Sequence, residues 1–303
     1  MKAVDGVSFN VEKGQIMGLV GESACGKTTL ALATMRLLPP AAKIMGGQIL
    51  FHGEDLLEKS EDEMTDIRWA KISIIFQGAL NSLNPVLPVR EQIAEAMLAH
   101  KTLPATNVDR AIDRVLKAVH LDPERKNNYP HELSGGMKQR VMIAMALACN
   151  PEIVIADEPT TALDVIVQRQ VLELIRSLRD ELQLALILIT HDLSVVAELC
   201  DKVAIMYAGK IVELGDIYSV FEGPKHPYTR GLLRSLPKMD EKKVEISYIP
   251  GYVPDLTGPL PACRFHGRCP YAKQICAETE PQFEIVRPGH QVSCHFWKEI
   301  EQS

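Results

Sequence analysis

A glycine-rich octapeptide near the start of the chain has the residue types of a phosphate-binding loop. Residues 21–28 read Gly-Glu-Ser-Ala-Cys-Gly-Lys-Thr and fit the pattern G-x-x-x-x-G-K-[ST]. Glycines let such a backbone curl so that its N–H groups face phosphate oxygens, and a helix that begins near Gly26 directs its positive end at the same anion. Lys27 would reach the β- and γ-phosphates, and Thr28 would ligate Mg²⁺. The loop predicts a Mg²⁺-dependent site for a nucleoside triphosphate.

Two carboxylates follow an apolar run farther along the chain. Residues 153–156 read Ile-Val-Ile-Ala and are followed by Asp157 and Glu158. The first acidic residue after such a strand commonly holds Mg²⁺, directly or through water. A neighbouring carboxylate can accept a proton from an attacking water only if it lies within about 3 Å of it. Alone, the pair is equally well explained as the acidic start of a helix, because carboxylates favour helix N-termini.

The segment Leu133-Ser134-Gly135-Gly136 provides a second candidate for anion binding. Ser134 fits the N-cap of the helix predicted for residues 137–149, and the two glycines expose backbone N–H groups. The N-terminus of a helix favours negative charge. The alternative is an ordinary glycine-rich turn or C-cap. The chain thus carries two candidate phosphate-binding elements in separate parts of the sequence.

The surrounding pattern predicts an α/β core that holds these loops. Parallel strands followed by helices are typical of such a core, and a long helical stretch at residues 88–148, broken at 127–130, predicts a helical insertion. A helix from residue 28 should stop before Pro39 and Pro40, at residue 38. The predicted strands are residues 7–11, 16–20, 47–53 (a hairpin), 153–156, 184–190, and the pair 203–207 and 210–214.

The composition indicates a globular chain with no membrane-spanning segment. The 303 residues are 46% hydrophobic and 24% charged, with a net charge of −6, which argues mildly against a nucleic-acid partner. No apolar run approaches the ~18 residues that span a bilayer, and we see no apolar signal region at the N-terminus. We therefore expect the seven cysteines to lie in a reducing compartment.

The composition shifts near Pro224, after which the chain is rich in proline, glycine and cysteine. We expect a nucleotide-binding unit at residues 1–223, with its helical subdomain at about 85–148, and an appended module at 224–303. The module contains Cys263, Cys269, Cys276 and Cys294, spaced C-x5-C-x6-C-x17-C.

Clustered thiols in a reducing compartment favour a metal site. Zinc sites usually show pairs spaced C-x2–4-C, which are absent here, although His266 or His295 could complete a Cys₃His zinc site. Iron–sulfur clusters need four thiolates and accept varied spacing. Free thiols or a disulfide remain a third possibility. We expect a structural or modulatory role for such a site, because nothing in the sequence suggests an electron partner.

The order of these motifs resembles the ATP-binding cassette (ABC) ATPases, in which two cassettes close face to face over ATP. The resemblance implies an α/β fold: a P-loop ABC ATPase core with an antiparallel β subdomain, a helical insertion subdomain and a small Cys-rich C-terminal extension. It assigns Glu158 as the base that polarises water, Gln77 as the residue that senses Mg²⁺, and His191 as the contact to the γ-phosphate. The resemblance thus implies the catalytic residues Glu158, His191 and Gln77. It implies the Mg²⁺ ligands Thr28, Gln77 and Asp157. The implied ATP-binding residues are Gly21, Glu22, Ser23, Ala24, Cys25, Gly26, Lys27, Thr28, Thr29, Gln77, Ser134, Gly135, Gly136 and Asp164, the serine–glycine group acting in the site of the opposing cassette.

The chain departs from the family pattern in two places. Ala24 stands where these cassettes usually have glycine, and if that position needs a positive φ, alanine costs on the order of 1 kcal/mol. No aromatic residue precedes Phe9, whereas the family has one that stacks on adenine after an extra strand. We therefore expect selectivity for adenine to be less strongly determined than phosphate binding.

Residues 226–230 and 263–270 resemble the C-terminal extension of peptide-importer ATPases, in which four cysteines are associated with a [4Fe–4S] cluster. The resemblance implies an ATP-hydrolysing subunit of a di- or oligopeptide importer, peripheral on the cytoplasmic face of the membrane. Implied partners are a second, paralogous ATPase subunit, two permeases that dock near residues 78–88, and indirectly an extracytoplasmic substrate-binding protein. Relatives that handle nickel, glutathione or sugars remain open, as do a non-transport ABC ATPase and an iron–sulfur redox protein with a vestigial ATP site.

Overall fold

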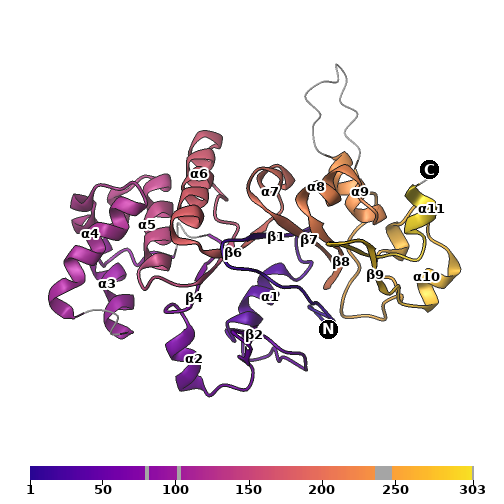
Figure 1. Ribbon diagram of the computed structural model, residues 1–303, viewed down its shortest axis with the longest axis horizontal. Coiled ribbons are helices and arrows are strands. Elements are labelled where there is room, and N and C mark those ends of the chain that lie inside the picture. Colours follow the sequence, from indigo (N-terminus) through magenta and orange to yellow (C-terminus); the bar gives the residue numbers. More distant parts are fainter. Residues whose placement is uncertain (79–81, 101–103, 236–247, 302–303) are drawn as a thin grey trace. The chain divides into compact units, whose positions relative to one another are not determined.

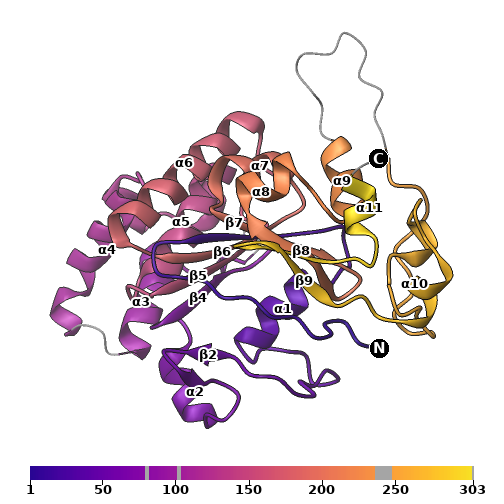
Figure 2. The same cartoon turned by 45° about the vertical axis from the view of Figure 1, so that its right-hand side comes forward.

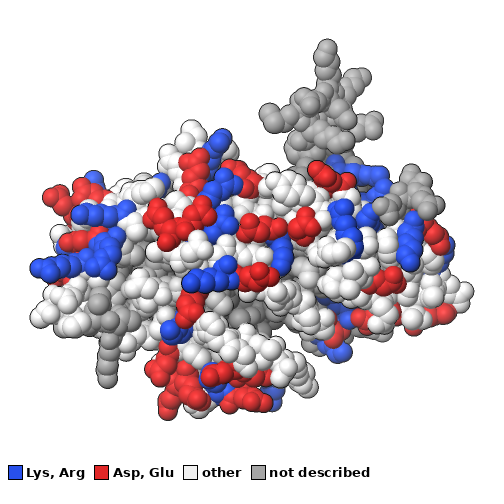
Figure 3. Space-filling view, in the orientation of Figure 1, with Lys and Arg blue, Asp and Glu red and all other residues white. Residues whose placement is uncertain are grey.

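The computed structural model describes residues 1–78, 82–100, 104–235 and 248–301, and these form two compact units. The P-loop unit comprises residues 1–10, 16–30 and 189–303, and the helical unit comprises residues 11–15 and 31–188. Within the described residues, no helix is both long enough and apolar enough to cross a bilayer. Lys and Arg side chains are interspersed with Asp and Glu side chains on the face shown in Figure 3.

The P-loop unit is built on a mixed sheet whose strand order is β1-β7-β8-β10-β9. The wholly buried strand β1 (Ile16–Val20) pairs in parallel with β7 (Lys202–Tyr207). The remaining strands, β8 (Lys210–Asp216), β10 (His290–Ser293) and β9 (Phe283–Arg287), add to it in antiparallel fashion. Residues from the C-terminal module therefore extend the same sheet that carries the phosphate loop.

Short helices complete the P-loop unit (Figure 1). Helix α1 (Lys27–Thr34) begins in this unit. The others are α7 (Leu193–Leu199), α8 (Ile217–Glu222), α9 (Pro227–Arg234), the 3₁₀ helix η5 (His266–Arg268), α10 (Gln274–Glu278) and α11 (Trp297–Glu301).

The helical unit combines three parallel-sheet strands with a group of helices. Strand β4 (Ile72–Ile75) pairs in parallel with β5 (Ile153–Asp157), and β6 (Ala185–Thr190) follows β5 in the sheet order. Helices α3 (Val89–Ala99), α4 (Val108–Ala118) and α5 (Gly135–Leu147) contact one another and lie side by side in both views (Figures 1 and 2). The other elements are the hairpin β2 (Leu50–Phe51) and β3 (Glu54–Asp55), α2 (Glu61–Ile67), η2 (Ala105–Asn107), η3 (Pro123–Asn127), η4 (Pro130–Glu132) and α6 (Val165–Leu182).

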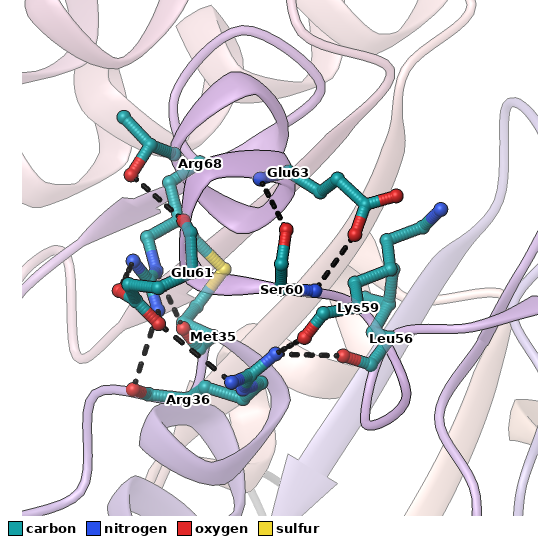
Figure 4. Close-up of polar contacts among 9 residues, drawn as sticks. Met35, Arg36, Leu56, Lys59, Ser60, Glu61, Glu63 and Arg68 are labelled. Carbon is teal, nitrogen blue, oxygen red and sulfur yellow. Dashed lines mark hydrogen bonds and ion pairs between the residues drawn. The ribbon is translucent and has the colours of Figure 1, made fainter.

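Polar contacts around α2 tie it to the segment that follows α1 (Figure 4). Ser60 and Glu63 form a capping box, in which the Ser60 hydroxyl accepts from the Glu63 N–H at 3.3 Å and the Glu63 carboxylate accepts from the Ser60 N–H at 2.7 Å. The Arg68 guanidinium donates to the Met35 carbonyl at 2.9 Å and pairs with Glu61. These contacts satisfy backbone groups that the ends of both helices leave open.

Two sequence predictions need correction, and two strands were not predicted. Residues 7–11 alternate between half-buried and exposed as expected, but they form no strand in the part of the chain that the structure describes. The helix predicted for residues 28–38 ends at Thr34, and Arg36 turns into the left-handed region at a φ of 52°. Strands β9 and β10 were not predicted from the sequence.

Candidate functional site

The octapeptide at residues 21–28 connects β1 to α1, as a phosphate loop requires. A Cβ atom on Gly21 would lie 2.0 Å from the Met206 carbonyl oxygen, so no side chain fits there. Gly26 has a φ of 104°, and a Cβ on it would lie 2.3 Å from the Ala3 carbonyl oxygen. Both glycines are therefore required by the local packing as well as by backbone curvature.

Lys27 lies inside the curl of this loop and is only 6% exposed. Its ammonium donates to the carbonyl oxygens of Gly21 at 2.6 Å and Glu22 at 3.0 Å. The loop carbonyl oxygens thereby hold the Lys27 ammonium within the same loop whose N–H groups would bind a triphosphate. Of the other loop residues, Ser23, Ala24 and Thr28 are exposed, Glu22, Gly26 and Thr29 are half-buried, and Gly21 and Cys25 are buried.

Ala24 has the positive φ at which an alanine in place of glycine costs energy. Its φ is 64°, in the left-handed region that L residues with a Cβ avoid. The loop is therefore strained at Ala24. The effect of this strain on nucleotide binding stays a prediction.

The acidic strand end brings two predicted catalytic residues together. Asp157 is the buried last residue of β5, and Glu158 follows it with a φ of 48°. The Gln77 amide nitrogen Nε2 donates to Glu158 Oε2 at 2.9 Å, and the Thr161 hydroxyl donates to the same oxygen at 2.9 Å. A left-handed backbone that neighbouring groups hold in place is common at functional sites. Thr161 was not predicted as a site residue, although it lies three positions before Asp164, which the resemblance implies as an ATP-binding residue.

Ser134 and Asp164 both act as helix N-caps in the helical unit. The Ser134 hydroxyl accepts from the Met137 N–H at 3.3 Å at the start of α5, and Ser134 and Gly135 are exposed. The Asp164 carboxylate accepts from the N–H groups of Ile166 and Val167 at 3.1 and 3.0 Å at the start of α6.

The two helix starts are packed closely. A Cβ on Gly136 would lie 2.6 Å from the Val167 side chain. Val165 and Ile166 on α6 are 82% and 72% exposed, an unusual amount of apolar surface beside a polar cap. We call residues Ser134, Gly135 and Gly136 the serine–glycine corner. This corner and the start of α6 form one exposed region.

His191 follows β6 and is exposed, next to Asp192, which caps α7. It belongs to the P-loop unit together with residues 21–29. The remaining predicted site residues belong to the helical unit: Gln77, Ser134, Gly135, Gly136, Asp157, Glu158 and Asp164.

The four C-terminal cysteines line one small cavity within the P-loop unit. Cys263, Cys269, Cys276 and Cys294 all contribute to its wall, with His226 and Phe265 among the other lining residues. Burial raises the pKa of the Cys263 thiol to about 11 and that of the Cys294 thiol to about 12. All seven cysteines of the chain are unbridged, and Cys25, Cys149 and Cys200 are buried.

The cysteine cavity lacks the geometry of a single-ion site. Among the described residues, no three or more His, Cys, Asp or Glu side chains are grouped so that they could hold a metal ion. Four thiolates around one Zn²⁺ at about 2.3 Å must nearly touch one another. The four thiols all line one small cavity.

Two extension residues contact the phosphate loop, and the sequence analysis did not single out either. The Tyr228 hydroxyl accepts from the Glu22 N–H at 2.9 Å, and the Arg268 guanidinium lies 2.9 Å from the Glu22 carboxylate. Both residues fall in the segments that resembled the extension, but contacts across 206 and 246 residues leave no local pattern.

Comparison with known proteins agrees with this geometry. The family model described as ABC transporter matches residues 4–161, and the model described as oligopeptide/dipeptide transporter, C-terminal region, matches residues 212–276. A protein described as a probable peptide ABC transporter ATP-binding protein, from Sinorhizobium fredii, is 48% identical over 99% of this chain and 90% of its own length. The dipeptide transport ATP-binding protein DppD of Bacillus subtilis is 47% identical over 97% of this chain and 89% of its own length.

Solved structures give the same result. The dimeric structure of MJ0796, a bacterial ABC transporter cassette, covers 71% of this chain and 90% of its own, with 28% identity and a TM-score of 0.62. The structure of cbiO1 from Clostridium perfringens covers 73% of this chain and 84% of its own, with 29% identity and a TM-score of 0.64. The fold predicted from the sequence is confirmed in its cassette portion. The chain belongs to the ATP-binding cassette transporter family, as one of its ATPases.

Proposed function

We propose that this ATPase powers the import of dipeptides or oligopeptides. The observation that carries the proposal is the similarity to peptide transport ATP-binding proteins, at 44–48% identity, over 97–99% of the chain, including the C-terminal module. Similarity confined to the cassette would support ATPase activity without indicating which substrate is transported. We assign residues 1–223 to nucleotide binding, with the helical subdomain at about 85–148, and residues 224–303 to the extension.

The residues that the family resemblance assigns are chemically suited to hydrolysing a Mg²⁺-bound triphosphate. Lys27 and the loop N–H groups would bind the phosphates, and the Thr28 hydroxyl, the Asp157 carboxylate and Gln77 are oxygen donors suited to Mg²⁺. When bound, Mg²⁺ neutralises charge that develops on the phosphate oxygens. Glu158 would orient and deprotonate the attacking water, held in place by Gln77 and Thr161, and His191 would contact the γ-phosphate.

We further propose that the working unit contains two cassettes. Ser134 and Gly135 at the start of α5 are exposed, so this helix end is open to phosphates bound by another subunit. The apolar side chains of Val165 and Ile166 lie beside them, and burial of such surface stabilises an interface. The second cassette would be a paralogous ATPase subunit, as the resemblance to peptide importers implies.

The cysteine cavity would hold a [4Fe–4S] cluster in preference to zinc. A cluster places its own iron and sulfide atoms between the thiolates, so it needs a wider cage than a single ion does. The support for this proposal is that four thiols line one cavity, the number of thiolates that a cluster needs. The raised pKa values of the Cys263 and Cys294 thiols mean that binding must displace protons from these two groups.

Anaerobic purification tests the cluster directly. We expect a brown protein that absorbs at about 410 nm and contains iron. Cys294→Ser should abolish both signals, whereas Cys200→Ala, which removes a buried thiol outside the cavity, should preserve them. Stoichiometric zinc without iron would overturn the proposal.

The transporter would be completed at the membrane by two permease subunits. With them, the chain would lie peripherally on the cytoplasmic face, and an extracytoplasmic binding protein would deliver the cargo. Residues 78–88 are the proposed docking segment, of which 79–81 lie outside the described residues. We assign no nucleic-acid partner, in keeping with the net charge of −6.

The cargo is best tested on the binding protein encoded beside this chain and its permeases. We expect that protein to bind dipeptides or oligopeptides, and the peptide-loaded form to stimulate ATP hydrolysis by the assembled transporter. Binding of nickel, glutathione or an oligosaccharide instead of peptide would contradict the proposed cargo while leaving the ATPase assignment intact.

A further inference from the structure

The phosphate loop contains a carboxylate of its own, which opposes the binding of a polyanion. Glu22 is the second residue of the loop, and its side chain is 28% exposed. An unpaired negative charge several ångströms from a triphosphate repels it with an energy that partial burial increases. The loop can bind ATP well only if this charge is neutralised or held away.

Arg268 supplies the neutralising charge from the C-terminal extension. Its Nη1 atom lies 2.9 Å from Glu22 Oε2, and its side chain is only 7% exposed. An ion pair in such a setting is screened by water far less than a surface pair. Arg268 is thus well placed to cancel the Glu22 charge.

Other contacts fix the Arg268 guanidinium in position. Its Nε atom donates to the Pro250 carbonyl at 2.9 Å, and its Nη2 atom donates to the Ile249 carbonyl at 3.1 Å. The guanidinium carbon lies 5.7 Å from the centre of the Tyr207 ring. Because these contacts restrain the guanidinium on several sides, Arg268 has little freedom to leave Glu22 and bind phosphate itself.

The extension also contacts the backbone at the same loop position. The Tyr228 hydroxyl accepts from the Glu22 N–H at 2.9 Å, and Tyr228 is fully buried. Its ring lies 4.7 Å from that of Tyr207 and 5.5 Å from that of Phe265, between centroids. Glu22 is therefore held by the extension through both its N–H and its carboxylate.

We propose that Arg268 is a positioning residue of the ATP site, which neutralises Glu22 and holds its carboxylate away from the phosphates. The C-terminal extension then sets the affinity of the chain for ATP, in addition to any role of its cysteines. The residue acts through Glu22 and contacts no nucleotide.

A double-mutant cycle on the full chain tests the proposal. Binding of Mg-ATP is measured by calorimetry for the wild type, Arg268→Gln, Glu22→Gln and the double variant. We expect Arg268→Gln to weaken ATP binding about tenfold. We expect the double variant to bind ATP within about twofold of Glu22→Gln, because the charge that Arg268 neutralises is gone.

A purely structural role would give a different pattern. If the double variant bound ATP as weakly as Arg268→Gln, or if Arg268→Gln bound ATP normally, the proposal would be overturned. Steady-state kinetics add a second readout: Arg268→Gln should raise KM for ATP with kcat changed less than twofold, since the residue acts on binding. A fall in kcat at unchanged KM would also contradict it.

A second pair of variants avoids any dependence on the folding of Arg268→Gln. Glu22→Asp keeps the charge but shortens the reach to Arg268, whereas Glu22→Gln removes the charge at nearly constant size. We expect Glu22→Asp to bind ATP several-fold more weakly than Glu22→Gln. Equal affinity of the two variants would refute the electrostatic account.

Discussion

The Gln77 side chain donates to Glu158 Oε2 at 2.9 Å, which joins two residues 81 positions apart in the sequence. The Thr161 hydroxyl donates to the same oxygen at 2.9 Å, so two donors restrain one oxygen of the proposed catalytic base. These two bonds fix the position of the carboxylate that is proposed to act on water. Glu158 also has a left-handed backbone, and such a conformation persists only where its surroundings stabilise it.

The Thr161 contact should matter for catalysis more than for binding. Thr161→Val removes the donor at nearly constant shape, and we expect kcat for ATP hydrolysis to fall by about three- to tenfold with KM changed little. Thr161→Ser keeps the hydroxyl and should retain most of the activity. Equal activity of the valine and serine variants would show that the bond to Glu158 is dispensable.

The left-handed residue in the phosphate loop, Ala24, predicts a variant that binds ATP as well as the wild type or better. Ala24 has a φ of 64°, and Ala24→Gly removes the steric cost of its Cβ, about 1 kcal/mol. We expect Kd for ATP to stay the same or fall by up to about fivefold, as measured by calorimetry. A clear loss of ATP binding in Ala24→Gly would contradict this.

The packing of the serine–glycine corner against α6 can be tested by steric compensation. A Cβ on Gly136 would lie 2.6 Å from the Val167 side chain, so Gly136→Ala should displace the start of α5 and lower the thermal midpoint. Val167→Ala removes the clashing methyl groups. We expect the double variant to be more stable than the sum of the two single changes predicts. Strict additivity would show that the two residues do not clash.

The cap of α9 predicts that stability depends on pH. His226 is buried, and the loss of hydration lowers its pKa from 6.5 to about 4, while Glu213 partly opposes this shift. Its Nδ1 atom accepts from the Tyr228 N–H at 3.1 Å, so the folded protein keeps this ring neutral. The unfolded chain binds the extra proton below about pH 6.5, and the folded chain binds it only below about pH 4.

The sign of the effect follows from this difference in proton binding. Stability from His226 is fully present above pH 6.5 and is lost as pH falls to about 4, by up to about 3 kcal/mol. Urea unfolding of the wild type and His226→Asn should be compared at pH 7.5, 5.5 and 4.5. Asparagine can still cap the helix but does not titrate, so the stability difference between the two proteins should shrink toward low pH. Parallel pH profiles would exclude His226 as the origin.

Local signals predicted the parts of the site that depend on short segments. A buried strand, a glycine turn and a helix start follow one another at residues 16–28. Because this order is the context that a phosphate loop requires, the sequence alone was sufficient to predict it. The same holds for Ser134, whose place before an apolar helix predicted its N-cap. Gln77 was identified by its position between other motifs, and its bond to Glu158 became visible only in the structure.

Long-range relationships explain most of what the sequence did not predict. Arg268 and Tyr228 gain their importance from Glu22, more than 200 residues away, and no periodicity reports such a contact. In β9, Phe283 and Ile285 are exposed although apolar, so alternation would have assigned them to the wrong face. Residues 7–11 show the reverse case, in which alternating burial occurs without a sheet.

The central claim is that ATP is bound between the phosphate loop of one subunit and the serine–glycine corner of another. Glu158→Gln should bind ATP without hydrolysing it, and Ser134→Arg in the same chain should keep ATP binding while blocking the shared face. The molar mass of Glu158→Gln, mixed with its counterpart ATPase subunit, is measured by light scattering with and without Mg-ATP. The account predicts a dimer only with Mg-ATP and only when Ser134 is intact. A strictly monomeric Glu158→Gln under saturating Mg-ATP, with the counterpart subunit present, would contradict it.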